Sequence, residues 1–335
     1  MTGYERVRVA LAGRRPDRVP VGEFALPSAL AAALLGRGTE QVPGGGPASW
    51  RVVEEAVGVL GLDAVGVVAG AGGSGSAGGG LTGPAWPEEV GYWAGRDLFV
   101  WVVVDGPWQG LAGAVGWSQA LLFLSGRNGA AGPGAVAEAE GLLLLQLDRT
   151  LAEVGRALEA GADGVVLGED VAYAGGLFPP PSVIRERLWP LWREVVRYCS
   201  GVRTARGERP LVCFHSDGSI EDLLSLIREA GFDAVHSLEP EAGMDVARLV
   251  GLYRGQLGLW GGLSVDLLVR GTLDRIIQEG KRLARAGSAG GLVVGTCSGV
   301  VPEGVPAGNL LAAYRAVTAP ATSDCRVGED DPPCP

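Results

Sequence analysis

Eight short apolar segments recur along the chain, and longer amphipathic stretches separate them. The apolar segments are residues 19–24, 64–68, 99–104, 164–167, 211–214, 234–238, 257–260 and 291–294. Their near-continuous apolar character is typical of strands that are buried on both faces of a parallel sheet. Strands that alternate with helices form βαβ units, and eight such units predict an α/β fold, a single (β/α)8 TIM barrel over residues 1–317.

Local signals mark several of the connecting helices. Ser219 precedes Glu221 and Asp222, which predicts a capped helix start there, and Gly231 predicts the end of that helix. Residues 183–200 form an amphipathic stretch in which Pro190 should kink the helix or split it in two. Helices are also expected over residues 270–286, between the last two strands, and over residues 308–317.

Three segments fall outside the barrel pattern. Residues 69–80 are almost wholly Gly, Ala and Ser, which predicts a mobile Gly-rich loop after the second strand. Residues 81–96 contain Trp86, Tyr92 and Trp93, and we expect them to form a small hairpin insertion over the barrel mouth. Residues 318–335 offer little to bury, so a disordered tail is expected.

Charge and apolar content narrow the class of protein. The net charge is −10 with no basic stripe to offset it, which argues against a nucleic-acid or anionic-membrane surface. No run approaches the roughly 18 apolar residues of a membrane span, and the N-terminus is charged where a signal peptide needs an apolar stretch. The five cysteines form no Cys-x-x-Cys pair, which favours reduced thiols. We therefore expect a cytoplasmic protein.

Polar residues follow most of the predicted strands. In barrel enzymes the catalytic groups come from these C-terminal strand ends. Carboxylates buried there without partners would be costly, so some are expected to be hydrogen-bonded, metal-bound or facing substrate. Lys281 is the only lysine and follows no strand, which excludes a Schiff-base amine catalyst. In chain order the strand ends hold Glu23, Gly70, Asp105, Glu169 with Asp170, His215 with Asp217, Glu239, Gly261 with Gly262, and Cys297.

His215 and Asp217 are the first candidates for chemistry. Side chains two residues apart on an extended segment point the same way, so both could converge on one ligand. They could bind a metal, or His215 could act as an acid or base that its neighbour orients. Alternatively, His215 bonds to loop backbone and Asp217 caps the following helix. His236 lies inside the next predicted strand and is expected to be a packed, hydrogen-bonded histidine.

Cys297 ends the eighth predicted strand, which neighbours the first strand in a closed barrel. Its thiolate could complete a His/Asp/Cys zinc site with His215 and Asp217 that stays open for a fourth ligand. It could also act as a nucleophile, or be a small buried residue at a tight turn.

The remaining strand-end candidates are carboxylates. Glu169 and Asp170 could do acid–base work or bind a cationic substrate, or they could serve as helix caps and salt-bridge partners. Glu239 is expected to face the barrel mouth, whereas Asp245 is expected to cap the next helix.

An ordered set of motifs accompanies these candidates over residues 4–317. Residues 5–21 read Glu-Arg-Val-x-x-Ala-Leu-x-Gly-x-x-Pro-Asp-Arg-Val-Pro-Val. Later motifs are Asp105-Gly106-Pro107, Gly168-Glu169-Asp170, His215-Ser216-Asp217-Gly218, Leu238-Glu239-Pro240-Glu241-Ala242-Gly243-Met244-Asp245, Trp260-Gly261-Gly262, and Val305-Pro306 with Asn309-Leu310. Together they resemble the uroporphyrinogen decarboxylase superfamily, which also holds the cobalamin-dependent, coenzyme M type methyltransferases. The resemblance implies a (β/α)8 barrel, in agreement with the strand count.

The chain departs from the decarboxylase branch at the residues that carry its activity. Those enzymes have an arginine-rich segment after the first strand, where residues 24–30 here contain no arginine. They have a Ser-Asp pair after the second strand, where this chain has Ala69 and Gly70, and a histidine near the last strand, which residues 296–299 lack. A strongly acidic mouth would also repel a porphyrinogen, which bears many carboxylates.

The methyltransferase branch resembles the chain better. Its members bind zinc through His-x-Cys and a later Cys, and the zinc activates a thiol acceptor. Here His215 matches, Asp217 replaces the first cysteine, which makes the site harder, and Cys297 lies close to the second. The resemblance therefore implies a corrinoid-linked methyltransferase with zinc at these three residues.

The same resemblance implies the partners and the catalytic set. We expect a small-molecule methyl donor or acceptor and a corrinoid supplied by a partner protein. The alternatives are a tetrapyrrole decarboxylase and a non-catalytic tetrapyrrole- or corrinoid-binding barrel, and a homodimer is left open. The catalytic residues are expected to be Glu169, Asp170, His215 and Glu239.

Overall fold

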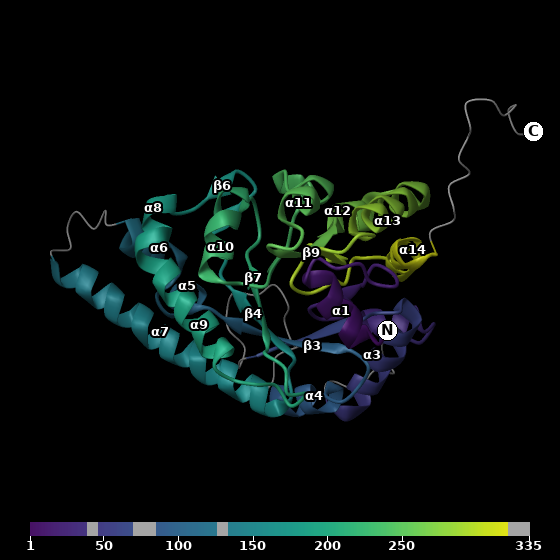
Figure 1. The fold of residues 1–335 in the computed structure, drawn as a ribbon, viewed down its shortest axis with the longest axis horizontal. Coiled ribbons are helices and arrows are strands. Elements are labelled where there is room, and N and C mark those ends of the chain that lie inside the picture. Colours follow the sequence, from purple (N-terminus) through teal and green to yellow (C-terminus); the bar gives the residue numbers. More distant parts are fainter. Residues whose placement is uncertain (39–45, 70–84, 126–132, 321–335) are drawn as a thin grey trace, which may run out of the picture.

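The fold is a parallel barrel surrounded by helices (Figure 1). A computed structural model describes residues 1–38, 46–69, 85–125 and 133–320. The barrel strands are β1 (Gly22–Glu23), β2 (Ala64–Val68), β3 (Phe99–Asp105), β4 (Gly164–Gly168), β7 (Leu211–His215), β8 (Ala234–His236), β9 (Gly258–Leu263) and β10 (Leu292–Thr296). Each lies within two or three residues of a predicted apolar segment, so the predicted barrel is confirmed.

The strands follow one another around the barrel in chain order. Every neighbouring pair from β1 to β10 is parallel, in the order β1-β2-β3-β4-β7-β8-β9-β10. A parallel bridge between Val21 and Val294 joins the last strand to the first. All strands therefore end on the same side of the molecule, where a barrel gathers its functional groups.

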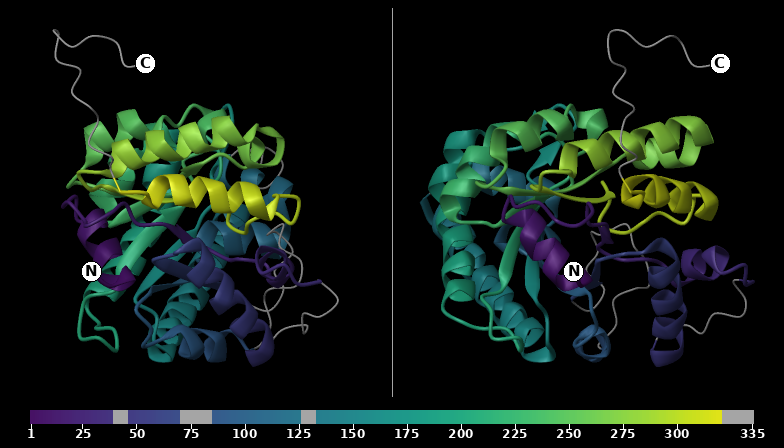
Figure 2. Two further views of the ribbon diagram at one scale, coloured as in Figure 1. Left: turned by 90° about the vertical axis from the view of Figure 1, so that its right-hand side faces the viewer. Right: turned by 45° about the vertical axis from the view of Figure 1, so that its right-hand side comes forward.

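Helices connect the strands on the outside of the barrel (Figures 1 and 2). A short antiparallel hairpin, β5 (Ala172–Tyr173) and β6 (Gly176–Leu177), follows β4. The longer helices include α7, which follows β3, and α13, which packs beside α14. The α-helices are α1 (Gly3–Leu11), α2 (Ser28–Leu34), α3 (Pro47–Leu60), α4 (Trp86–Trp93), α5 (Pro107–Val115), α6 (Trp117–Ser125), α7 (Pro133–Ala160), α8 (Pro181–Val183), α9 (Trp189–Ser200), α10 (Leu224–Ala230), α11 (Val246–Tyr253), α12 (Val265–Arg270), α13 (Leu273–Gly287) and α14 (Ala307–Thr318).

Every second side chain along a strand points into the barrel, and these side chains fill its interior. Phe99, Trp101 and Val103 of β3 belong to one apolar cluster, and Leu211 and Cys213 of β7 belong to it too. Since successive strand residues point to opposite faces, the next inward position on β7 is His215, and by the same rule the position after Ala234 on β8 is His236. The period of the strands thus carries both histidines into the upper layer of the barrel.

A charged network closes the opposite, N-terminal end of the barrel. Val7 and Leu11 of α1 pack into the interior cluster from below. Asp63, just before β2, accepts hydrogen bonds from Arg6, Arg18 and the backbone N–H of Val21, and its side chain is 2% exposed. The opening motif of the sequence therefore serves this structural network rather than the strand-end site.

The sequence predicted some connections correctly. The stretch 183–200 is divided, because a π-helical turn, Ile184–Leu188, precedes α9, and Pro190 lies in the first turn of α9. Gly231 ends α10 with a left-handed conformation (φ 97°), and Asp245 caps α11 by accepting from two backbone N–H groups.

Two local predictions are wrong. The described part of the segment 81–96 forms helix α4 rather than a hairpin, because Trp86, Val90 and Trp93 recur at helical spacing and are buried along one face. The Ser219 side chain does not cap a helix: a 3₁₀ turn, Glu221–Leu223, precedes α10, and the Ser219 backbone N–H donates to Tyr173 O (3.0 Å).

Two other predictions lie mostly outside the described residues. The Gly-rich loop 69–80 is described only at Ala69, and the tail predicted from 318 only as far as 320, with Thr318 as the last residue of α14.

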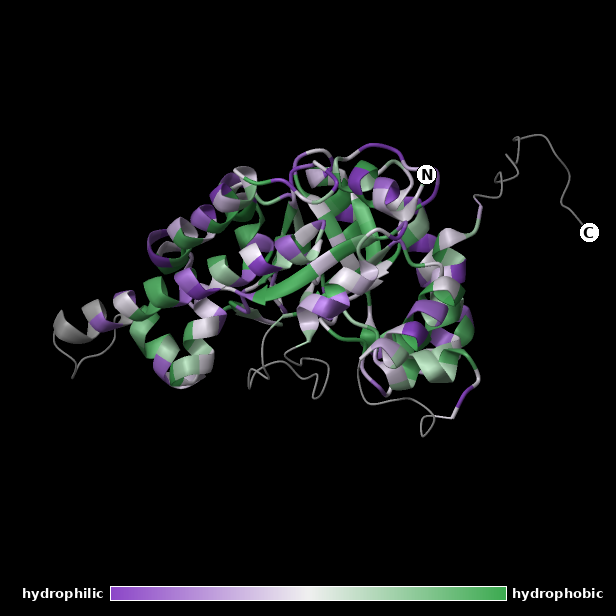
Figure 3. Cartoon of the chain, turned by 90° about the horizontal axis from the view of Figure 1, so that it is seen from below, coloured by the Kyte–Doolittle hydropathy of each residue, from purple (hydrophilic) through white to green (hydrophobic). Residues whose placement is uncertain are grey.

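Apolar residues concentrate in the strands and on the helix faces turned toward them (Figure 3). None of the helices, over the residues described, combines the length and the apolar character that crossing a bilayer demands.

Candidate functional site

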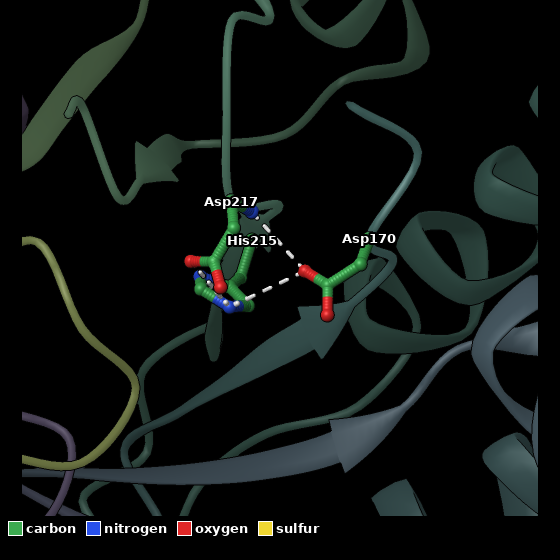
Figure 4. Close-up of side chains that lie close together, drawn as sticks. All are labelled: Asp170, His215 and Asp217. Carbon is green, nitrogen blue, oxygen red and sulfur yellow. Dashed lines mark hydrogen bonds and ion pairs between the residues drawn. The ribbon is translucent and has the colours of Figure 1, made fainter. Parts of the chain in front are cut away.

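Three ligand-type side chains converge at the C-terminal ends of β4 and β7. His215 ends β7, Asp217 follows in the loop, and Asp170 follows β4, which pairs with β7. His215 Nε2 lies 3.7 Å from Asp170 Oδ1 and 3.8 Å from Asp217 Oδ1 (Figure 4). Within the described part of the chain, one ligand atom from each of the three residues lies within 4.8 Å of the other two. We call these residues the Asp–His–Asp group.

Backbone hydrogen bonds fix the two loops that carry this group. Asp170 Oδ1 accepts from the backbone N–H of Asp217 (3.1 Å), and the carbonyl of Asp170 accepts from the indole of Trp108 (2.8 Å). The Ser216 hydroxyl accepts from the N–H of Val171 (3.1 Å). These hydrogen bonds hold the carboxylate of Asp170 and the backbone of residues 216 and 217 in place.

His215 is supported from below by a second histidine. Its Nδ1 lies 2.9 Å from Nδ1 of His236, and Nε2 of His236 lies 3.1 Å from the carbonyl oxygen of Thr296. The ring of Phe24 stacks on His236, with centroids 4.0 Å apart. Burial lowers the pKa of His236 well below the usual value, and the neighbouring His215 acts in the same direction. His236 is the packed, hydrogen-bonded residue that was expected, and its partner is the candidate site residue.

Glu169 points away from the Asp–His–Asp group. Its carboxyl is fully buried and accepts from the backbone N–H groups of Trp108 (3.3 Å) and Gln109 (3.0 Å) and from the indole of Trp192 (2.8 Å). Burial raises its pKa to about 8, while these three donors act in the opposite direction. Glu169, predicted to be catalytic, holds the start of α5 here, which is the capping alternative.

Two further carboxylates surround the group. Burial raises the pKa of Glu239, and the carboxylate of Asp217 adds to the effect while the N–H of Gly218 opposes it. Burial also raises the pKa of Asp105 to about 6, with contributions from Glu153 and Asp170. Glu239 is therefore close enough to interact electrostatically with Asp217 and His215, and Asp105 with Asp170.

Cys297 is not a member of the Asp–His–Asp group. Its buried thiol donates to the carbonyl of Leu238 (3.4 Å), and burial raises its pKa well above the ordinary value. A thiol held in its protonated form is a poor nucleophile. Asp170 occupies the place in the three-residue group that the sequence had suggested for Cys297.

The donor set of the group suits a divalent cation. Two ligand atoms that are each about 2.1 Å from a tetrahedral ion lie about 3.4 Å apart, close to the 3.7 and 3.8 Å observed. Imidazole nitrogen with carboxylate oxygens is a ligand set that zinc accepts. The carboxylates supply negative charge where the cation would lie.

Sequence reasoning missed two features of this site. The proximity of Asp170 to His215 was not predicted, because only the pairing of β4 with β7 brings the two side chains together. The contact between His215 and His236 was also missed, although these residues are register partners on adjacent strands. The sequence did contain a signal for this contact, because Ala234 and His236 are two residues apart and therefore lie on the same face of the strand.

Comparisons with known proteins found one matching family model and several similar solved structures. A family model described as uroporphyrinogen decarboxylase (URO-D) matches residues 136–319. Among curated proteins no sequence matches the chain. A methyltransferase from Methanosarcina mazei has a similar structure, with a TM-score of 0.69 at 17% identity over 94% of this chain and 98% of that one. A 7,8-dihydropteroate synthase from Vibrio fischeri gives a TM-score of 0.39 at 10% identity over 91% of this chain and 95% of that one.

Proposed function

The chain belongs to the uroporphyrinogen decarboxylase family, and we propose that it is a corrinoid-linked methyltransferase that acts on a small substrate. The observation that carries this proposal is the Asp–His–Asp group, in which one imidazole and two carboxylates meet at neighbouring strand ends. Such a group could bind a metal ion together with a small polar molecule.

Zinc is the metal we propose for this group. Asp170, His215 and Asp217 would hold it, and when bound it would supply Lewis acidity that polarises the methyl donor or acceptor. Two carboxylates in place of thiolates make this a harder site, which favours an oxygen or nitrogen atom as the substrate's ligand. Glu239, beside Asp217, would orient the substrate.

The charge of the site favours methyl transfer over decarboxylation of a porphyrinogen. The Asp–His–Asp group, Asp105 and Glu239 together place four carboxyl groups near the strand ends. Segment 24–30, where the decarboxylases carry arginines, contributes the buried apolar side chains of Phe24 and Leu26 instead. A substrate with many carboxylates would be repelled by these four carboxyl groups. We propose that a separate corrinoid protein docks at this end of the barrel.

The metal proposal is tested by zinc titration of the purified protein. We expect about one zinc per chain, and each of His215→Ala, Asp170→Asn and Asp217→Asn should weaken binding by about 100-fold or more, since an outer-shell substitution alone costs 10–100-fold. Asp274→Asn, at the exposed start of α13, is the matched control and should bind as the unsubstituted protein does. Absence of stoichiometric zinc, or binding that His215→Ala leaves unchanged, would rule this site out.

The family match itself favours a second candidate, a tetrapyrrole decarboxylase, and leaves open a barrel that binds tetrapyrrole or corrinoid without turnover. Turnover of uroporphyrinogen would support the decarboxylase. Demethylation of methylcobalamin in the presence of small nucleophiles, followed by its visible spectrum, would support methyl transfer. Tight spectral titration with cobalamin or porphyrin and no turnover would indicate a binding protein.

A further inference from the structure

The contact between the two histidines restricts which ring nitrogens carry protons. His215 and His236 are the only histidines of the chain, and their Nδ1 atoms lie 2.9 Å apart. A hydrogen bond at this distance needs one donor and one acceptor, so the two Nδ1 atoms share a single proton. The question is which ring holds it.

The far side of His236 limits the answer. Its Nε2 lies 3.1 Å from the carbonyl oxygen of Thr296, and because a carbonyl only accepts, this nitrogen carries a proton. Thr296 is held in turn, because its N–H (3.2 Å) and its hydroxyl (2.7 Å) donate to the buried carboxyl of Glu23. The hydrogen bonds of Thr296 therefore fix the acceptor that keeps a proton on Nε2 of His236.

The surroundings of His236 keep its ring neutral. The residue is 1% exposed, it stacks on Phe24, and Trp260 lies edge-on with centroids 5.3 Å apart. Its polar contacts are His215 and the Thr296 carbonyl, so no carboxylate in the described residues is hydrogen-bonded to it. A neutral ring with its proton on Nε2 accepts at Nδ1, and the shared proton then belongs to His215 Nδ1.

We propose that His236 is a positioning residue that keeps the proton of neutral His215 on Nδ1, so that the lone pair of Nε2 faces the position between Asp170 and Asp217 where the metal would bind. Nε2 is the nitrogen that lies 3.7 and 3.8 Å from the two carboxylates. A ligating histidine that donates its other N–H to a fixed acceptor is oriented and made a better ligand. The inference rests on the proposed function for its purpose, but the tautomer itself can be observed without metal.

The first test uses nitrogen NMR of the ¹⁵N-histidine-labelled, metal-free protein. Only two imidazoles contribute, and His215→Ala assigns them. At a pH well above the ordinary imidazole range, we expect His215 to be protonated on Nδ1 and His236 on Nε2. A neutral His215 protonated on Nε2 would overturn the inference whether or not the protein binds zinc.

The second test compares two replacements of similar shape. His236→Leu removes the acceptor, so we expect loss of the pure Nδ1–H form of His215 and a 10–100-fold weaker zinc affinity. His236→Asn keeps an acceptor oxygen near the original Nδ1, and we expect it to retain the tautomer and most of the affinity. If His236→Leu keeps both, the positioning role is wrong.

The two tests separate this inference from the function it rests on. If the unsubstituted protein binds no zinc but shows the Nδ1–H form, the metal proposal fails and the positioning of His215 stands. If zinc binds although neutral His215 carries its proton on Nε2, the metal proposal stands and the positioning inference fails. Should His236→Leu fail to fold, the spectra of the unsubstituted protein and of His236→Asn still decide.

Discussion

Glu169 and Asp170 are adjacent carboxylates, but their side chains point in different directions and make different contacts. Glu169 turns outward to the start of α5 and to Trp192, where three N–H groups donate to it. Asp170 turns toward His215 and the N–H of Asp217. The same functional group therefore stabilises the fold at Glu169 and belongs to the candidate site at Asp170.

The raised pKa of Glu169 makes stability depend on pH. Its pKa is about 8 in the folded protein, above the ordinary value of 4.5. The folded state then holds a proton that the unfolded state releases, so its contribution is complete below about pH 4.5 and is lost as the pH rises through 8. Within that window we expect the free energy of unfolding to fall by up to about 1.4 kcal/mol per pH unit.

Urea unfolding at several pH values, with Glu169→Gln beside the unsubstituted protein, measures this effect. The variant cannot titrate, so its free energy of unfolding should change less between pH 5 and pH 8. Parallel profiles for the two proteins would contradict the assignment.

At the scale of elements, the loop after β7 is built against the β5–β6 hairpin. Gly218 has a φ of 83°, and a Cβ there would lie 2.5–2.6 Å from backbone atoms of Tyr173. The adjacent N–H of Ser219 donates to the carbonyl of Tyr173. This close approach holds the segment that carries Asp217, so the geometry of the Asp–His–Asp group depends on a glycine.

Gly218→Ala should therefore be more damaging than an equivalent change elsewhere. Gly207, with φ 79° and nothing within 4 Å of its Cβ position, is the matched control. We expect Gly207→Ala to cost about 1–2 kcal/mol of unfolding free energy from backbone strain alone. Gly218→Ala should cost more and should also weaken zinc binding. Equal losses in thermal or urea unfolding would show that the hairpin contact is unimportant.

At the scale of the whole molecule, the two ends of the barrel carry different groups of charged residues. The N-terminal end holds the network of Arg6, Arg18 and Asp63, and the C-terminal end holds the Asp–His–Asp group. The strands and the apolar interior separate the two ends. Charged residues at the first end pair with one another, and we propose that those at the second end carry the chemistry.

Asp63→Asn tests this division. Removing the charge leaves two arginines without their buried partner, and breaking such a pair costs about 3–5 kcal/mol. We expect urea unfolding to show a loss of this order while the zinc affinity of the folded protein stays unchanged. A large change in zinc affinity with stability preserved would mean that the two ends are coupled.

The sequence by itself determined the strands, their order and the end of the barrel where the polar strand-end residues gather. Apolar runs, helix stripes and strand-end polarity are local, and each depends on residues within a few positions of one another. The same local rules failed where a segment is compatible with either a hairpin or a helix. In segment 81–96 a hairpin was predicted, but the aromatic residues belong to helix α4.

Only the tertiary structure decided which of the strand-end side chains meet. Asp170 joins His215 because β4 and β7 are neighbours, whereas Cys297 bonds to Leu238 and stays out of the group. His236 reaches His215 through the register of β7 and β8. Contacts between residues far apart in the chain depend on strand pairing, closure and the direction of each side chain, and the local pattern does not contain these distances.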